Sequence, residues 1–388
     1  MKVLSHITET FTESVIREMT RISDALGGYN LSQGFPDFDS PEDIKNAAIE
    51  AIHKNYNQYP VTFGEPELRN AISQKAFIYN HIKCNPDSEI TVTCGATEAM
   101  IATLVAIVNP GDEIIIFEPF YENYGPDGII SGATPRYVTL HTPDWHIDYN
   151  ELAAAFNNKT KAIIINTPNN PTGKVFSKED YKVISDLCQK WDVYAITDEI
   201  YEHIIYDGLE HISLASLPGM DDRTITINSI SKTYSVTGWR VGWAIASAPI
   251  TARIRKIHDF LTVGAPTPFQ QAASKALYFP NEYYKNLQKK YTESRDFLFK
   301  VLQDNGFKPF KPSGAYYIIT DVSELWKIFN PSDDYDFCCK LIERTKVATV
   351  PGFSFYSKSG KTTKQIRFAF CKKPETLSKV KELFSKNL

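Results

Sequence analysis

The residues best suited to chemistry lie in one short stretch, Ser229-Ile-Ser-Lys-Thr-Tyr-Ser-Val-Thr-Gly-Trp-Arg240. Lys232 stands three residues after Ser229 and eight before Arg240. A buried lysine loses its charge more easily than an exposed one, and its amine then attacks carbonyl carbons. A serine hydroxyl and an arginine guanidinium both suit a phosphate. Together these residues predict a lysine that forms a Schiff base with a phosphorylated aldehyde, which indicates pyridoxal phosphate.

A short β-branched run, Thr224–Asn228, precedes Lys232 and is typical of a buried strand. Lys232 therefore follows the carboxyl end of a strand, where open α/β sheets bind their ligands. The spacing Ser229-x-x-Lys232 also matches the serine nucleophile motif of penicillin-recognising enzymes. The sequence lacks the Ser-Asp-Asn and Lys-Thr-Gly partners of that motif, so we do not adopt this interpretation.

Two further turns follow apolar runs. Gly95-Ala96-Thr97 lies between a predicted strand, Ile90–Cys94, and a predicted helix, Thr97–Val108. The free amides at the start of that helix could bind a phosphate, or the turn could be an ordinary helix cap. Asn170 lies in a turn rich in proline and asparagine after the run Lys161–Asn166. This second turn could position a ligand-binding amide or simply reverse the chain.

Asp198 and Glu199 directly follow the apolar run Val193–Thr197. A buried carboxylate needs a cationic partner. A protonated pyridine nitrogen would supply that partner, and the pairing would keep the ring an electron sink. Tyr201 could bond to the phenolate oxygen of the same ring. The alternative is a helix N-cap with a solvated acidic face.

Arg367 lies in an alternating apolar run, Gln365–Phe370, that predicts a strand. An arginine in such a strand needs a carboxylate or phosphate partner. That partner is either a structural acid or the α-carboxylate of a substrate.

Strand-like runs alternate with helical patterns through the middle of the chain, which predicts a mostly parallel sheet covered by helices on both faces. The other predicted strands here are Glu113–Phe117 and Val241–Ala246, and the other predicted helices are Tyr121–Ser131 and Ser177–Lys190. After Pro280 a long predicted helix, 281–305, leads into a smaller α+β region with predicted strands at 315–320, 347–350 and 365–370. We expect an N-terminal arm that forms part of the small domain (1–40), a large domain (41–280) and a C-terminal small domain (281–388).

Composition limits the possible partners. The chain of 388 residues has a formal net charge of −4, which gives no reason to expect nucleic-acid or membrane binding. Its six cysteines form no CxxC pair, and its start lacks the apolar core of a signal peptide, so we expect a reduced, cytoplasmic setting. The eight histidines form no metal-binding motif, and we expect no metal.

These motifs, in this order and spacing, resemble the class I/II aminotransferases of pyridoxal-phosphate fold type I over nearly the whole chain. The segment Leu31-Ser-Gln-Gly-Phe-Pro-Asp-Phe38 looks most similar to the branch that contains kynurenine, glutamine–phenylpyruvate and methionine aminotransferases. The resemblance implies that Lys232 forms the Schiff base and then acts as acid and base. It also implies that Asp198 pairs with the pyridinium nitrogen and that Asn170 and Tyr201 bond to the phenolate oxygen.

The resemblance further implies that the ring of Tyr121 stacks on the cofactor. The phosphate would be held by the amides of Gly95, Ala96 and Thr97 together with the side chains of Ser229 and Arg240. The substrate carboxylate would be received by Arg367, Asn170 and the Gly34 backbone.

Tyr59 would reach the phosphate of the other subunit, so the active unit would be a homodimer. The interface segment Thr262–Phe269 lacks the second arginine of aspartate-type members, which makes a dedicated dicarboxylate substrate doubtful. An apolar or aromatic side-chain pocket fits better, with Tyr59, Tyr121 and Phe35 as candidate walls. The rival activities are a cysteine-conjugate carbon–sulfur β-lyase on the same scaffold and a non-catalytic binding protein that retains the fold.

Overall fold

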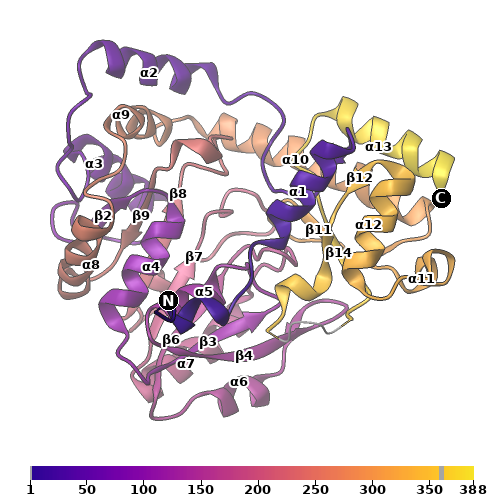
Figure 1. Cartoon of the computed structure of the whole chain (residues 1–388). Helices are drawn as coiled ribbons and strands as arrows, with labels where there is room; N and C mark the ends of the chain where they lie inside the picture. The colour runs from indigo at the N-terminus through magenta and orange to yellow at the C-terminus, as the bar shows by residue number, and fades with distance from the viewer. Residues whose placement is uncertain (1, 358–361) are drawn as a thin grey trace.

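A computed structural model describes residues 2–357 and 362–388 of the chain. Its main element is an eight-stranded sheet with the strand order β2-β9-β8-β7-β6-β3-β4-β5 (Figure 1). The strands are β2 (Ile90–Thr93), β3 (Glu113–Glu118), β4 (Thr134–His141), β5 (His146–Ile147), β6 (Thr160–Asn166), β7 (Tyr194–Asp198), β8 (Thr224–Ser229) and β9 (Gly242–Ile245).

The prediction of a mostly parallel sheet is confirmed, because β4, β3, β6, β7 and β8 are joined by parallel pairings. The strand expected at Val241–Ala246 is present as β9, but it runs antiparallel to both β2 and β8. The connection between β8 and β9 holds Lys232 and Arg240 and contains only the 3-10 helix η4 (Thr237–Trp239), so it lacks the α-helix that usually forms a parallel crossover.

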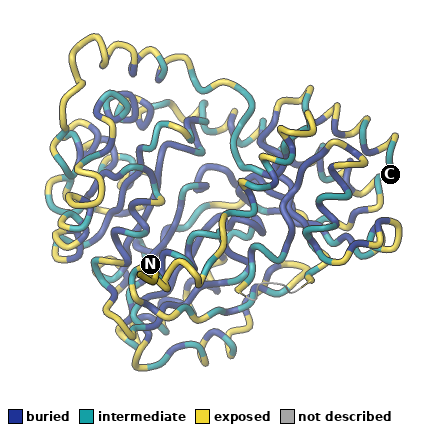
Figure 2. Tube along the Cα trace, in the orientation of Figure 1, coloured by how far each residue is buried: buried dark blue, intermediate teal, exposed yellow. Residues whose placement is uncertain are grey.

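Both faces of this sheet are buried, because successive strand residues point to opposite sides. Ile114 and Ile116 of β3 pack in the cluster formed with α4 (Ala96–Ile107), α5 (Tyr124–Ile130) and α8 (Ala248–Leu261). Ile115 between them packs in the cluster formed with α6 (Tyr149–Ala155) and α7 (Lys178–Trp191). The buried trace therefore follows the strands through the centre of the molecule (Figure 2).

The C-terminal part is organised around a second, antiparallel sheet with the order β10-β11-β14-β13. It is entered through the long helix α10 (Asn281–Asp304), as expected. Its strands are β10 (Lys308–Pro309), β11 (Tyr317–Asp321), β13 (Val350–Pro351) and β14 (Gln365–Ala369), and its helices are α11 (Ser323–Phe329), α12 (Asp334–Thr345) and α13 (Pro374–Asn387).

One strand prediction in this part is wrong. The single strand expected at 347–350 is two strands, because the chain changes partner at Thr349. Val347 and Ala348 form β12, which pairs in parallel with β1 (Tyr29–Asn30) near the N-terminus. Val350 instead pairs with Arg367 of β14.

The N-terminal segment contacts both parts of the molecule. Helix α1 (Val15–Ala25) lies beside β12 and β13, while the hydroxyl of its cap, Ser14, donates to Glu122 Oε1 at 2.5 Å beside the large sheet. Helix α3 (Pro66–Lys75) packs against β2 and α9 (Thr267–Ala276) and continues into the π-helix η2 (Ala76–Asn80), while α2 (Glu42–His53) packs against α9. The domain boundaries at residues 40 and 280 stay a prediction.

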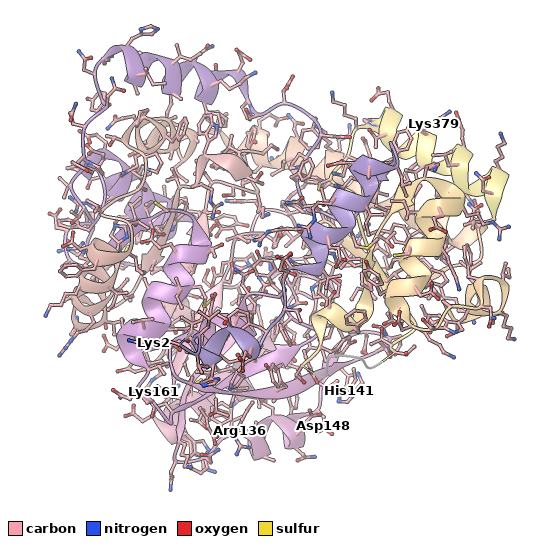
Figure 3. The ribbon with its side chains drawn as sticks, viewed as in Figure 1. Lys2, Arg136, His141, Asp148, Lys161 and Lys379 are labelled. Carbon is pink, nitrogen blue, oxygen red and sulfur yellow. The ribbon has the colours of Figure 1, made fainter. Side chains whose placement is uncertain are left out.

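Charged side chains such as Lys2, Arg136 and Lys379 lie at the periphery, as expected for a chain of mixed charge (Figure 3). Within 2–357 and 362–388, no helix combines the length and the apolar character needed to cross a membrane.

Candidate active site

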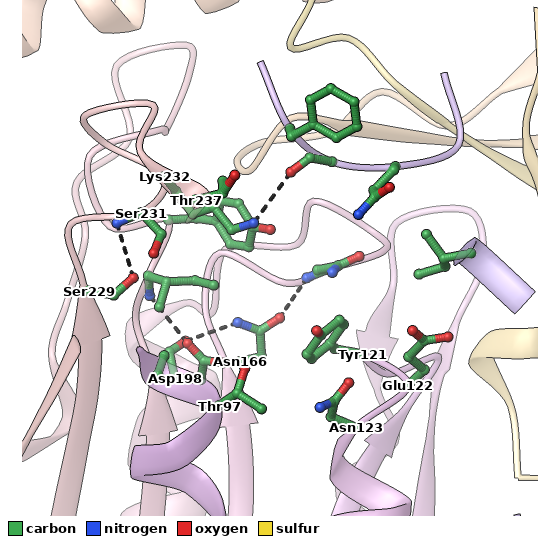
Figure 4. Close-up of a pocket in the computed structure, with 18 of the residues that line it drawn as sticks. Thr97, Tyr121, Glu122, Asn123, Asn166, Asp198, Ser229, Ser231, Lys232 and Thr237 are labelled. Atoms are coloured by element: carbon green, nitrogen blue, oxygen red, sulfur yellow. Dashed lines mark hydrogen bonds between the residues drawn. The ribbon is translucent and has the colours of Figure 1, made fainter. Parts of the chain in front are cut away.

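A cavity of about 470 Å³ lies at the carboxyl ends of β6, β7 and β8, and β11 and β14 of the second sheet contribute to its wall (Figure 4). Most of the residues expected from the sequence line it. They are Gly34, Phe35, Ala96, Thr97, Tyr121, Asn170, Asp198, Tyr201, Ser229, Lys232, Arg240 and Arg367. Ligand binding at the carboxyl ends of parallel strands is typical of open α/β sheets, and the expected placement of these residues is found.

Lys232 follows β8 by three residues and projects into this cavity (Figure 4). Its ammonium donates to the backbone oxygen of Gly34 at 3.3 Å and lies 5.8 Å from the ring centres of Tyr201 and Tyr316. Burial lowers the pKa of Lys232 to about 8, although the nearby Asp198 opposes that shift. The amine is therefore far more available in its neutral, nucleophilic form than that of an exposed lysine.

Asp198 is the last residue of β7, and its carboxylate is buried at the cavity wall. Its Oδ2 accepts a hydrogen bond from the Tyr124 hydroxyl at 2.7 Å, and its Oδ1 accepts one from the Ile200 amide at 3.3 Å. Burial raises the pKa of Asp198 to about 6, and the hydrogen bond from Tyr124 opposes that rise. No cationic side chain of the described residues hydrogen-bonds to this carboxylate, so a protonated ring nitrogen would meet the need for a cation.

A cradle for an anion lies at the start of α4. Gly95 precedes the helix with φ 82° and provides no side-chain cap, so the first amides of the helix are open to the cavity. A Cβ on Gly95 would collide with the Arg240 guanidinium, and a Cβ on Gly242 would lie 2.5 Å from the Ala96 nitrogen. Ser229, Ser231 and Thr237 line the cavity with Ala96 and Arg240. These donors fit a phosphate.

Arg367 is fully buried in β14 and reaches the opposite wall of the cavity. Its Nη1 donates to Asn170 Oδ1 at 2.8 Å and its Nη2 donates to the Ser32 backbone oxygen at 2.7 Å. Its Nε has no partner among the described residues. None of the carboxylates in the described parts of the chain pairs with it, which favours a ligand carboxylate over the structural acid.

Two expected residues lie outside the cavity lining. Gly95 is absent from the lining but adjoins it through Ala96 and Arg240. Tyr59 is 85% exposed and lies on the surface of this subunit. Its reach into another subunit's site stays a prediction, as do the individual roles of the cavity residues.

Several lining residues are absent from those expected from the sequence. Tyr124 lies one helical turn after Tyr121, and that spacing could have indicated it. The Tyr317 ring packs against Arg367, with 4.1 Å between the guanidinium carbon and the ring centre. Nothing in the sequence distinguishes Tyr317 from an ordinary strand residue. Others come from the N-terminal segment before β1 and from α5, where no local pattern indicates a site: Ser14, Ile16, Arg17 and Asp127. Gln33 could have been indicated by its place directly before Gly34 and Phe35.

Comparison with known proteins agrees with this geometry. The family model described as "Aminotransferase class I and II" matches residues 27–382. Kynurenine–oxoglutarate transaminase 3 of Bos taurus is 37% identical, over 94% of this chain and 86% of that protein. The methionine aminotransferase of Escherichia coli is 35% identical, over 94% of this chain and 93% of that protein.

Solved structures give the same result for the fold. N-succinyldiaminopimelate aminotransferase from Mycobacterium tuberculosis superposes with a TM-score of 0.94 at 34% identity, and each chain is covered over 100% of its length. An Escherichia coli protein with a methionine aminotransferase function superposes with a TM-score of 0.93 at 33% identity, again over 100% of both chains. The fold is thus the fold type I arrangement expected from the sequence, and the chain belongs to the class I and II aminotransferases, a family of pyridoxal-phosphate-dependent enzymes.

Proposed function

We propose that this aminotransferase moves the amino group of an L-amino acid with a methionine, aromatic, glutamine or kynurenine type of side chain to a 2-oxo acid. The observation that carries the proposal is the placement of Lys232 in one cavity with Asp198 on one wall and Arg367 on the other. Transamination needs three groups from the protein: a carboxylate that binds a cationic ring, an amine, and a cation that binds the substrate carboxylate. Asp198, Lys232 and Arg367 would supply them in that order.

The cofactor would be held by residues whose unpaired charges and hydrogen-bond donors are complementary to its ring nitrogen and its phosphate. Asp198 would hold the ring nitrogen, and the cradle of Gly95, Ala96, Ser229 and Arg240 would hold the phosphate. When bound, pyridoxal phosphate supplies an aldehyde and a ring that delocalises the electron pair left on the substrate Cα.

The chain's own groups would perform the remaining tasks. Arg367 binds the α-carboxylate of the substrate through a charge-assisted pair, which fixes the direction of the Cα–H bond. The Nζ of Lys232, once neutral and free, accepts the proton from Cα and can return it. Because one keto acid leaves before the second enters, the two half-reactions follow ping-pong kinetics.

The preference for the substrate's side chain rests on the apolar and aromatic residues that line the cavity. Phe35 and Tyr121 line the cavity, and Ile16 of α1 joins them. Thr262–Phe269 offers no arginine to a second carboxylate. The names of the kynurenine and methionine aminotransferase relatives agree with a preference for such side chains.

We also propose that the active unit is a homodimer in which Tyr59 crosses to the partner's site. Exposed apolar residues gather where the segment after α2 meets the end of α8: Tyr59, Val61, Phe260, Leu261 and Val263. Two hydrogen bonds hold these segments together. The Thr267 hydroxyl donates to the Gln58 backbone oxygen at 2.8 Å, and His258 Nε2 lies 2.6 Å from the Thr62 backbone oxygen. An apolar patch of this kind is typical of an interface between protein chains.

A cytoplasmic location is part of the same proposal. All six cysteines are free thiols, and Cys338 and Cys339 both lie on α12. Free thiols in such number are typical of a reducing compartment.

A panel of amino acids tests the function. In single turnover with the holoenzyme, methionine, phenylalanine, glutamine and kynurenine are expected to convert the cofactor absorbance well ahead of aspartate. Initial-rate lines at several concentrations of the second substrate should be parallel. Intersecting lines, or a preference for aspartate, would contradict the proposal. Release of pyruvate and ammonia from a cysteine conjugate without a keto acid would instead support the β-lyase.

Substitution of Gly95 tests the phosphate cradle. Gly95→Ala places a methyl group against the Arg240 guanidinium at a backbone angle that alanine rarely adopts. We expect the dissociation constant of pyridoxal phosphate to rise about tenfold or more, because the methyl group would displace the Arg240 guanidinium and weaken a charge-assisted hydrogen bond worth about 1.5–3 kcal/mol. Gly111→Ala is the matched control, because Gly111 also has a positive φ of 95° but has no atom within 4 Å of its added methyl. Equal affinity in both variants would show that the cradle lies elsewhere.

The pKa of Lys232 predicts how cofactor attachment depends on pH. Because the pKa is lowered to about 8, the neutral amine is the minor form below pH 8 and the major form above it. The rate at which the apoprotein reacts with pyridoxal phosphate should rise about tenfold per pH unit up to pH 8 and then level off. Stopped-flow absorbance measures this rate. A rate that keeps rising toward pH 10 would mean that the reacting lysine has an ordinary pKa.

A further inference from the structure

A buried polar cluster lies behind the turn that carries Asp198 and Tyr201, on the side away from the cavity. We call it the clamp, and it consists of Lys75, Asn80, Glu199, Glu202, His211 and Ser213. None of these six residues is part of the cavity lining, although Glu199 and Glu202 are chain neighbours of Asp198 and Tyr201. Groups of this kind are expensive to bury, so the clamp requires an explanation.

The turn after β7 alternates between the cavity and the clamp. Asp198, Ile200 and Tyr201 line the cavity, whereas the carboxylates of Glu199 and Glu202 bond within the clamp. The two anchored glutamates therefore bracket the two lining residues Ile200 and Tyr201. Movement of this turn would break several buried hydrogen bonds at once.

Glu199 is anchored by three donors that all reach its Oε2. Ser213 donates its hydroxyl at 2.6 Å, His211 contributes Nε2 at 2.8 Å, and the Asn80 amide lies at 3.4 Å. The same Asn80 amide donates to Glu202 Oε2 at 2.8 Å and to the Ser213 hydroxyl at 2.8 Å. Asn80, which ends the π-helix η2, thus connects both glutamates to one element.

The clamp contains its own cation. The Lys75 ammonium contacts Glu202 Oε1 and donates to Asn80 Oδ1 at 2.8 Å. Burial alone would raise the pKa of Glu202, but Lys75 and the neighbouring histidines lower it to about 2. Glu199, Glu202 and His211 place ligand-type atoms within 4.8 Å of one another, as in a metal site. Because Glu202 is already paired with Lys75, and Glu199 already accepts from Ser213 and contacts His211, we assign no metal to them.

We propose that Glu199 is a positioning residue that acts through Asp198: the clamp holds its negative charge behind Asp198 and so strengthens the binding of a protonated cofactor ring. This inference rests on the proposed binding of the ring nitrogen by Asp198.

The direction of the electrostatic effect supports the proposal. Burial raises the pKa of Asp198, and the charge of Glu199 acts in the same direction, whereas Lys232 acts against it. A fixed negative charge behind the carboxylate makes positive charge on the far side of Asp198 more favourable. The other titratable groups around Glu199 are Glu202 and His203 of its own turn, Lys75 of α3, Tyr79 of η2, Tyr181 of α7 and His211.

The test compares Glu199→Gln with the wild-type holoenzyme and apoprotein. Glutamine retains the size of glutamate and one oxygen that can accept from the donors to Oε2, but it removes the charge. We expect the dissociation constant of pyridoxal phosphate to rise about tenfold, which corresponds to one unit of pKa. The pH midpoint at which the bound cofactor changes its absorbance should fall, because loss of a negative charge disfavours protonation nearby. A purely structural role would not move this midpoint.

Asp334→Asn is the matched control, because Asp334 is a buried carboxylate of α12 that accepts from the Thr363 and Lys364 amides, away from the cavity. It should lower the melting temperature without changing cofactor affinity or the pH midpoint. If Glu199→Gln does not fold, Ser213→Ala provides the second variant, because it removes one donor that holds the Glu199 carboxylate in place. The pH midpoint should then fall, but by less than the value predicted for Glu199→Gln, because the charge is retained and only less firmly positioned.

An unchanged affinity and midpoint in Glu199→Gln, with wild type that binds the cofactor and transaminates, would overturn this inference alone. A wild-type protein that does not transaminate the amino-acid panel would instead overturn the proposed function.

Discussion

The burial of unpaired charge around one cavity is the constraint on which this structure depends. Asp198 has no cationic hydrogen-bond partner among the described residues, and Arg367 has no carboxylate partner among them. Lys232 is held where burial lowers its pKa to about 8. Each of these groups would be more stable in water, so the fold has to hold them in place against that preference. The ligands that would pair with them are a protonated ring, an aldehyde and a carboxylate.

The two sheets meet this constraint from opposite sides. The parallel strands β6, β7 and β8 end at the same edge, so that Asn170, Asp198 and Lys232 meet although they are far apart in sequence. The antiparallel sheet supplies Arg367 through β14, where its neighbour β11 places Tyr317 beside it. The N-terminal segment completes the wall through Gly34, whose backbone oxygen accepts from both Lys232 and Tyr316. Close contact between Gly34 and the Tyr317 hydroxyl leaves no space for a side chain at position 34.

Much of this site is predictable because its parts are local signals repeated at strand ends. The apolar runs before Asp198 and Lys232 are long enough to predict strands, and parallel strands share one carboxyl edge. Tyr317 and the α1 residues are not predictable in this way, because only the packing of one sheet against the other brings them to the cavity. The strand expected at 347–350 was wrong for a related reason: Val347 and Val350 pair with strands from opposite ends of the chain. The orientation of β9 likewise depends on the connection through Lys232, which lacks the helix of a parallel crossover, and is not evident from the residues of the strand.

The identity of the lysine that binds the cofactor is the most direct test of this view of the cavity. Borohydride reduction of the holoenzyme converts the carbon–nitrogen bond between the lysine and the cofactor into a stable amine, and peptide mass spectrometry then locates the modified residue. The geometry predicts modification of Lys232 in the peptide between β8 and β9, and loss of that label in Lys232→Ala. Stoichiometric label on a different lysine, or label retained in Lys232→Ala, would contradict it.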